Sequence, residues 1–255
     1  MPDAMSIEYM SIEYFILVGA GALAGGFVAG LAGFGTGITA MGVWLYVLPP
    51  TVAATLVVVC SAASQIQTLP KIWHAITPRR VLPFIVPGLI GVPLGTALLA
   101  MVDVKTFKIG IGCLLLAYTA NALLLGPRPA SNWGGRVADS TVGFLGGVLG
   151  GLAGLSGPLP TMWASLRGWS KDQRRAVFQA FNLSILMAAL LTHTVAGLMT
   201  RELGLAVLTA LPFTFLGARL GVALYARVSE EKFSKIILTL LGFSGLTLVV
   251  MNLTS

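Results

Sequence analysis

The chain has 255 residues, of which 56% are hydrophobic and only 10% are charged. An ordinary soluble domain carries about 25% charged residues, so this composition excludes a soluble globular protein. The net charge of +7 would suit nucleic acid or acidic lipid, but its distribution along the chain favours a membrane-topology signal instead.

Apolar segments that are long enough to cross a bilayer recur along the chain. A helix needs about 20 residues to cross a hydrocarbon core of roughly 30 Å. We predict membrane helices at Tyr14–Ala32, Val52–Leu69, Val81–Val102, Phe107–Leu125, Ser140–Ala153, Ala176–Leu198, Leu203–Tyr225 and Phe233–Leu253. Residues 1–13 contain acidic residues and no basic residue, which is unlike a signal peptide, so we expect a short exposed lead-in there.

Two shorter apolar pieces each follow a glycine-rich break. Ile38–Leu48 and Leu159–Leu166 are too short to cross a bilayer unaided, so we predict that they are half-helices. The first break, Gly25–Met41, resembles Gly146–Met162, which keeps Gly, Gly, Gly-Leu-Ala-Gly and Met at an offset of 121 residues. Such an internal duplication in a membrane protein predicts two structural repeats.

The positions of lysine and arginine distinguish two topologies, because short cytoplasmic loops retain basic residues. If each broken segment crosses the bilayer once, the 16 basic residues divide ten against six. If each broken segment is a hairpin that enters and leaves on one face, only Lys105, Lys108 and Arg201 lie opposite the rest. The second topology is favoured. It places both termini outside and gives each repeat an odd number of elements.

We therefore predict an all-α integral membrane protein with two inverted repeats. Residues 14–126 form the first membrane repeat and residues 139–255 form the second. Each repeat contains a broken-helix hairpin plus three transmembrane helices. Residues 127–138 are expected to be a cytoplasmic linker, within a single membrane domain overall.

The two breaks are the strongest candidates for a binding site. Non-helical backbone at membrane depth is tolerated only where protein buries it or where it lines a polar cavity. Gly35, Thr36 and Gly37 open the first half-helix, and Ser156 and Gly157 open the second. Free N–H groups and the positive end of the helix dipole at such tips favour an anion. The other glycines, at four-residue spacing, fit close helix packing.

Polar side chains in the spans that follow the hairpins extend the candidate site. Ser61, Ser64 and Gln65 lie on one helical face of the first repeat. Gln179 and Asn182 lie one turn apart in the second repeat. These side chains either line the cavity or form interhelical hydrogen bonds.

His193 follows Asn182 by close to three helical turns and is a candidate for proton coupling. The alternative is that it lies near an outer helix end, in contact with water. No acidic residue lies deep in a predicted span, which disfavours a cation site. The sequence has no metal-ligand cluster and no nucleophile with an adjacent base, so we expect no enzyme activity, no metal and no cofactor.

The motifs resemble those of the sulfite exporter TauE/SafE family, also called the toluene sulfonate uptake permease family. The resemblance rests on GGFVAGLAGFGTGI, its copy GGLAGLSGPLP, the segment QRRAVFQAFNLSI and the later LGARLG. In that family the first break often has three consecutive glycines, and here Thr36 interrupts them. The resemblance implies a transporter for sulfite or for an organosulfonate such as sulfoacetate.

From the resemblance and the anion-friendly tips we expect a secondary transporter that exports such an anion by alternating access. The substrate would be held at the half-helix N-termini near the midplane. An uptake permease, or a channel for another small anion, is the alternative. The expected partners are a small anionic substrate and the lipid bilayer but not nucleic acid, and a homodimer is left open. The expected location is the bacterial inner membrane, crossed several times, with both termini periplasmic.

Overall fold

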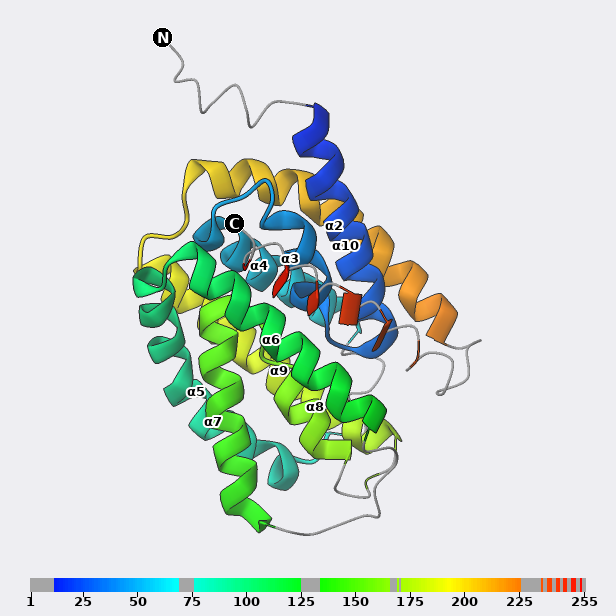
Figure 1. The fold of residues 1–255 in the computed structure, drawn as a ribbon. Helices are drawn as coiled ribbons and strands as arrows, with labels where there is room; N and C mark the ends of the chain where they lie inside the picture. The colour runs from blue at the N-terminus through cyan, green and yellow to red at the C-terminus, as the bar shows by residue number, and fades with distance from the viewer. Residues whose placement is uncertain are drawn as a thin grey trace.

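The structure is a computed structural model that describes residues 12–68, 76–124, 134–165, 169 and 171–225, and from there on residues 235, 238–239, 242–243, 245–246, 249–250 and 253. Up to residue 225 the described residues form nine helices and no strand (Figure 1). The helices are α2 (Ile12–Ala32), α3 (Thr36–Trp44), α4 (Pro50–Thr68), α5 (Pro78–Met101), α6 (Val104–Leu124), α7 (Gly135–Ala153), α8 (Pro158–Ser165), α9 (Lys171–Val195) and α10 (Arg201–Tyr225).

The helices agree with the apolar segments of the sequence. Helices α2, α4, α5, α6, α7, α9 and α10 correspond to predicted spans, and α3 and α8 correspond to the predicted half-helices. The predicted span Phe233–Leu253 and most of the predicted linker fall largely outside the described residues. By length and hydropathy α2, α4, α5, α10 and the Arg175–Val195 part of α9 are able to cross a membrane. The prediction of an all-α membrane protein is therefore confirmed.

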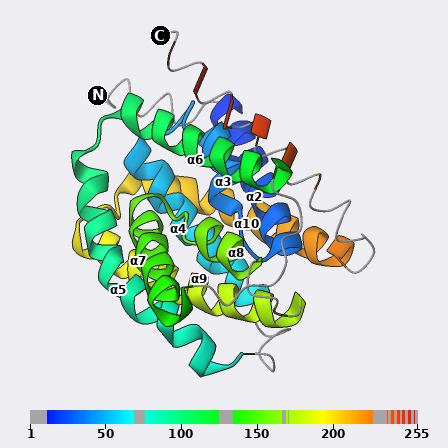
Figure 2. The same ribbon diagram turned by 60° about the horizontal axis from the view of Figure 1, so that its bottom comes forward.

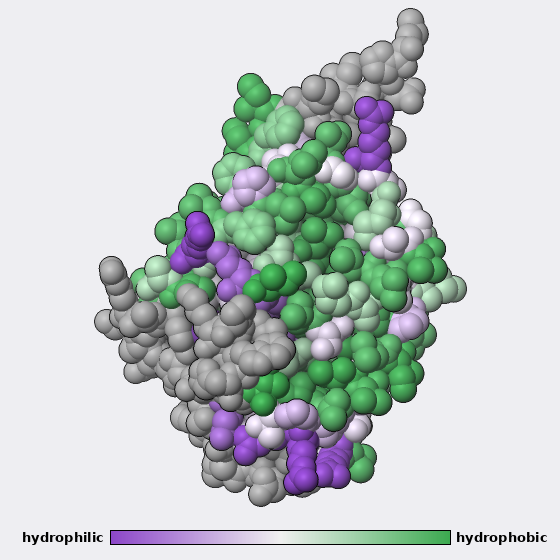
Figure 3. All heavy atoms as spheres, turned by 180° about the vertical axis from the view of Figure 1, so that it is seen from behind, coloured by the Kyte–Doolittle hydropathy of each residue, from purple (hydrophilic) through white to green (hydrophobic). Residues whose placement is uncertain are grey.

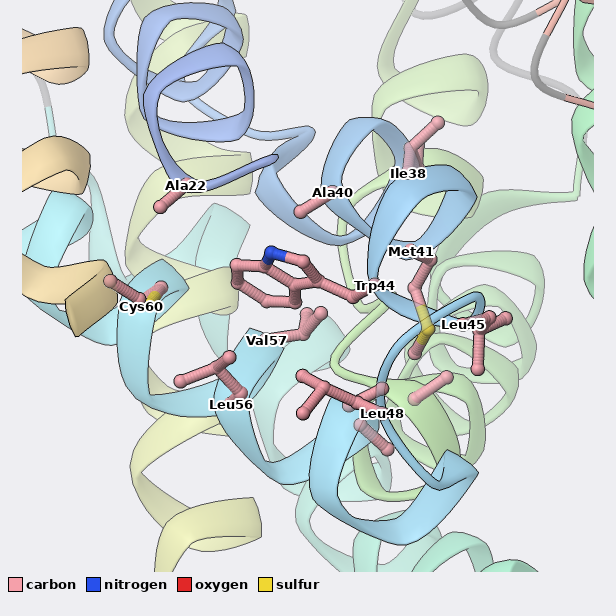
Figure 4. Close-up of a cluster of buried hydrophobic side chains, with 14 of the residues drawn as sticks. Ala22, Ile38, Ala40, Met41, Trp44, Leu45, Leu48, Leu56, Val57 and Cys60 are labelled. Carbon is pink, nitrogen blue, oxygen red and sulfur yellow. The ribbon is translucent and has the colours of Figure 1, made fainter. Parts of the chain in front are cut away.

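Helix α3 turns back and runs along α2, so the two form a hairpin. A side chain on Gly25 would meet Ala40, and one on Gly21 would meet Trp44, which shows that the two helices are antiparallel. The indole nitrogen of Trp44 donates a 3.1 Å hydrogen bond to the carbonyl of Val18. Figure 4 shows this buried indole packed among apolar side chains of α2, α3 and α4. We call α2 and α3 the first hairpin.

Helix α8 turns back along α7 in the same way. Gly150 lies against Ser156 near the turn, and the indole nitrogen of Trp163 donates a 2.7 Å hydrogen bond to the carboxylate of Asp139 near the other end. Trp163 thus anchors the second half-helix to the helix before it, as Trp44 does in the first. We call α7 and α8 the second hairpin.

The two halves of the chain pack against each other through glycines. Gly26 and Gly30 of α2 lie against the backbone of Thr214 and Ala218 in α10, so these helices are in close contact and parallel. The same relation holds between α7 and α5, where a side chain on Gly147 would collide with the backbone of Gly88. Small residues at four-residue spacing permit this close approach of helices in a membrane. Both views show α2 beside α10 and α5 beside α7 (Figures 1 and 2).

The main contacts between the two halves of the chain are symmetric, because each main contact made by one half has a counterpart made by the other. The first helix of each half packs on the fourth helix of the other, and α4 packs on α9. In Figure 1, α2 runs downward from its first residue and α7 runs upward. These are the contacts and directions that inverted repeats would have. The inversion of the repeats across a bilayer stays a prediction.

The face of the bundle seen in Figure 3 is mostly apolar, with hydrophilic residues toward its edges. Large apolar side chains such as Ile90 and Leu208 are exposed, at 67% and 74%. The arginine side chain of Arg80 lies 5.8 Å from the ring of Trp169, which joins the start of α5 to the start of α9. We call the end of the bundle where α5, α7 and α9 begin the basic end.

Candidate functional site

Three glycines with positive φ shape the tips of the two hairpins. Gly33 and Gly154 follow α2 and α7 with φ of 81° and 66°, and they lie at matching positions of the repeated motif. A left-handed residue just after a helix is a common C-terminal cap, and glycine adopts it without a Cβ penalty. Gly35, with φ of 107°, precedes α3 and lets the chain reverse within a few residues.

The two tips meet in the interior between α4 and α9. Gly157 packs against Phe34, and Gly37 packs against Leu155. Between them lies a cavity of about 10 Å³. The lining includes most of the predicted site residues: Gly35, Thr36, Gly37, Ser61, Gln65, Ser156, Gly157 and Asn182. The structure therefore brings together residues from both halves of the chain.

The start of α3 supplies hydrogen-bond donors to this cavity. The first amides of a helix have no acceptor within the helix, and here they belong to Thr36, Gly37 and Ile38. The side chain of Thr36 is only 1% exposed, and its hydroxyl has no hydrogen-bond partner. Leaving a buried hydroxyl unpaired costs about 1–3 kcal/mol, so this group is available to a ligand at the tip.

The start of α8 is poorer in donors than the sequence analysis assumed. The helix begins at Pro158 and has a second proline at Pro160, and a proline has no N–H group. Among its first three residues only Leu159 has an amide hydrogen. Free amides are therefore concentrated on the first hairpin.

The second hairpin contributes Ser156, which contacts the side chain of Asn182 on α9. The hydroxyl of Ser156 donates a 2.7 Å hydrogen bond to the side-chain oxygen of Asn182. This bond fixes the orientation of the amide group, because the oxygen accepts. The amide nitrogen of Asn182 then lies beside Gly157, where an added Cβ would be 3.0 Å from it. A second donor group thus faces the cavity from α9.

Gln65 connects the cavity to the end of α2. Its side-chain nitrogen donates a 2.6 Å hydrogen bond to the carbonyl of Gly33. No charged side chain is among the described residues that line the cavity. In this part of the chain, helix dipoles and neutral donors are therefore the groups that would stabilise a buried anion.

Three predicted site residues lie outside the cavity wall. The hydroxyl of Ser64 is bonded to the carbonyl of Cys60 in the preceding turn. The side-chain nitrogen of Gln179 donates to the hydroxyl of Thr68 at 3.3 Å, closer to the basic end. His193 is 0% exposed, so the alternative that it is in contact with water is wrong. The reason is that the end of α7 covers its ring, which contacts the carbonyl of Gly151.

Arg175 is a further polar residue near the site, although its place before an apolar run indicated only a loop charge. Arg175 lies within α9, is 9% exposed and donates a 3.3 Å hydrogen bond to the carbonyl of Gly30. The available signal was its spacing. It precedes Asn182 by seven residues, which is close to two helical turns and places both on one face.

The fold and the site define a multi-pass membrane protein with a polar cavity between the ends of two interrupted helices, an arrangement found among membrane transporters. Over residues 17–248 the chain matches the family described as sulfite exporter TauE/SafE, and it belongs to that family of transporters. The resemblance seen in the sequence motifs is thereby confirmed. No curated protein and no solved structure matches the chain.

Proposed function

We propose that the protein exports a sulfur-containing oxyanion, sulfite or a short organosulfonate such as sulfoacetate, across the bacterial inner membrane. The observation that carries the proposal is the buried, unpartnered hydroxyl of Thr36 at the start of α3, in a cavity wall whose described residues carry no charge. Family membership supports the class of substrate.

The donors around the cavity suit a group with several acceptor oxygens. Thr36 and the first amides of α3 approach from the first hairpin, and the amide nitrogen of Asn182 approaches from α9. A sulfite or sulfonate group has three oxygens around one sulfur, so it can accept from these directions at once. Hydrogen bonds to a charged acceptor are about twice as strong as neutral ones, which offsets the loss of water.

The size of the cavity supports alternating access. A volume of about 10 Å³ is close to the smallest that holds one water molecule. A sulfonate therefore needs the two tips to separate before it can bind. We infer that the structure corresponds to a closed state between one that faces inward and one that faces outward.

The basic end is proposed to face the cytoplasm. Arg79, Arg80 and Arg136 lie at the starts of α5 and α7, where the positive-inside rule places cytoplasmic residues. The N-terminal start of α2 would then face the periplasm, and so would the C-terminus.

Flux measurements in sealed membrane vesicles test this function. We expect inside-out vesicles to accumulate radiolabelled sulfite or sulfoacetate in a saturable manner, and we expect Thr36→Leu to abolish the accumulation. Accumulation only by right-side-out vesicles would show that the protein takes the anion up and does not export it. A flux that does not saturate would indicate a channel. Equal flux with and without the protein would overturn the proposal.

A further inference from the structure

One face of α9 spans the bilayer and carries a polar group on each side of the cavity. Arg175 and His193 are 18 residues apart, which is about five helical turns, so they lie on the same face. The rise between them is roughly 27 Å at 1.5 Å per residue. Asn182, which lines the cavity, lies between them on this face.

Arg175 and His193 contact matching positions of the two hairpins. The guanidinium of Arg175 donates to the carbonyl of Gly30 in α2, and the imidazole Nε2 of His193 lies 2.7 Å from the carbonyl of Gly151 in α7. Gly30 and Gly151 occupy the same position in the repeated motif GLAG. Each hairpin is thus held to α9 by a polar side chain at this matching position, and the second hairpin is also held there by the bond from Ser156 to Asn182.

These carbonyls need an external donor. The last four carbonyls of a helix have no partner within it, and Gly30 and Gly151 lie among the last residues of α2 and α7. The amide of Leu155, which would otherwise reach Gly151, is bonded to the carbonyl of Leu149. A donor at a helix C-terminus also complements the negative end of the helix dipole.

Further hydrogen bonds extend the Arg175 contact into a layer on the basic side of the cavity. Gln65 donates to the carbonyl of Gly33, and Gln179 donates to the hydroxyl of Thr68. The layer joins α2, α4 and α9. It lies between the cavity and the starts of α5, α7 and α9. We call it the basic-side layer.

A corresponding layer surrounds His193 on the opposite side. Its Nε2 faces a carbonyl, which only accepts, so this nitrogen carries the hydrogen. Its Nδ1 lies 3.0 Å from the hydroxyl of Thr55. The hydroxyls of Thr96 and Thr192 are 2.8 Å apart nearby. This opposite-side layer joins α4, α5, α7 and α9.

We propose that the two layers are the two gates of the transporter and that Arg175 and His193 are the positioning residues that hold them closed. Release of the first hairpin from Arg175 opens a path to the basic side. Release of the second hairpin from His193 opens a path to the other side. The proposal rests on the proposed alternating access and assigns the elements that move.

Side-specific labelling tests the gates without any substrate. Leu186 lines the cavity, so Leu186→Cys places a thiol there. The native thiols are removed by Cys60→Ala and Cys113→Ser. A membrane-impermeant maleimide is then applied to inside-out and right-side-out vesicles. The rate of modification reports how often the cavity opens to each side.

We expect Arg175→Gln to raise the labelling rate from the basic side about tenfold and to leave the other side unchanged, as expected when a hydrogen bond to a charged group is lost. His193→Gln should do the reverse. Arg219→Gln is the matched control for Arg175→Gln, because Arg219 is also an arginine but is exposed. Thr194→Ala is the matched control for His193→Gln, because Thr194 is the next residue in the sequence and is exposed. The controls should change neither rate.

Equal changes from both sides would indicate general loosening and would overturn the assignment, and so would unchanged rates. If either variant fails to insert, Thr68→Val and Thr55→Val each remove one partner of the same layers and carry the same expectations. Anion binding by the parent protein is measured in parallel. If the parent protein binds the anion but the variants do not change labelling from one side only, the gates are refuted and the proposed function is not. If the variants change labelling from one side only but the parent protein binds no anion, the proposed function is refuted and the gates are not.

Discussion

Ser156 and Asn182 are joined by a 2.7 Å hydrogen bond between the tip of the second hairpin and the middle of α9. The bond spans 26 residues of sequence and lies in the wall of the cavity. It uses the oxygen of the Asn182 amide and so leaves the nitrogen to face the cavity. The donor character of this side of the site therefore depends on one hydroxyl.

The charge at Asn182 should decide whether an anion binds. Asn182→Asp keeps the shape of the side chain and the bond from Ser156, but it replaces a donor with a negative oxygen. We expect sulfite binding to be undetectable at neutral pH, and we expect the buried carboxylate to lower the melting temperature as well. Isothermal titration calorimetry measures the first and circular dichroism the second. Asn121→Asp on α6 is the control and should bind as the parent does.

The hydroxyl of Thr36 is expected to bind the substrate directly. Thr36→Val removes the hydroxyl with almost no change in volume. Losing a hydrogen bond to a charged ligand costs about 1.5–3 kcal/mol, so the dissociation constant should rise roughly 10- to 100-fold. Thr39→Val on the same helix is the control, since Thr39 does not line the cavity. Equal effects of both substitutions would argue against the contact.

The glycine contact between α5 and α7 should limit stability. A Cβ on Gly147 would collide with the backbone of Gly88, and a backbone cannot move aside as a flexible side chain can. Gly147→Ala is expected to lower the free energy of unfolding by about 1–3 kcal/mol. Gly204→Ala on α10 meets no atom within 4 Å and should not destabilise. Thermal unfolding in one detergent compares the two, and equal melting temperatures would contradict the packing.

Much of the fold follows from local sequence, for a physical reason. Lipid requires each backbone amide to be bonded within its own segment, so apolar runs become helices. The broken segments could be recognised because glycines interrupt those runs, as at Gly33 and Gly35. The hairpins followed from the positions of basic residues rather than from any local propensity.

The site was predictable only in part, because helical spacing does not say which side of a helix meets a cavity. Ser61 and Ser64 are one turn apart, yet only Ser61 lines the cavity. The depth of Arg175 depends on how far α9 extends beyond its apolar run. The burial of His193 depends on the second hairpin, which is distant in sequence. Such facts come from packing between repeats.

The most direct test is a calorimetric titration of the purified protein with sulfite, sulfate, thiosulfate, sulfoacetate and acetate. Sodium is titrated separately to test for cation binding. We expect one saturable site that prefers sulfite or a sulfonate, and no heat from sodium. No binding of any sulfur oxyanion, or binding of sodium in the cavity, would contradict it.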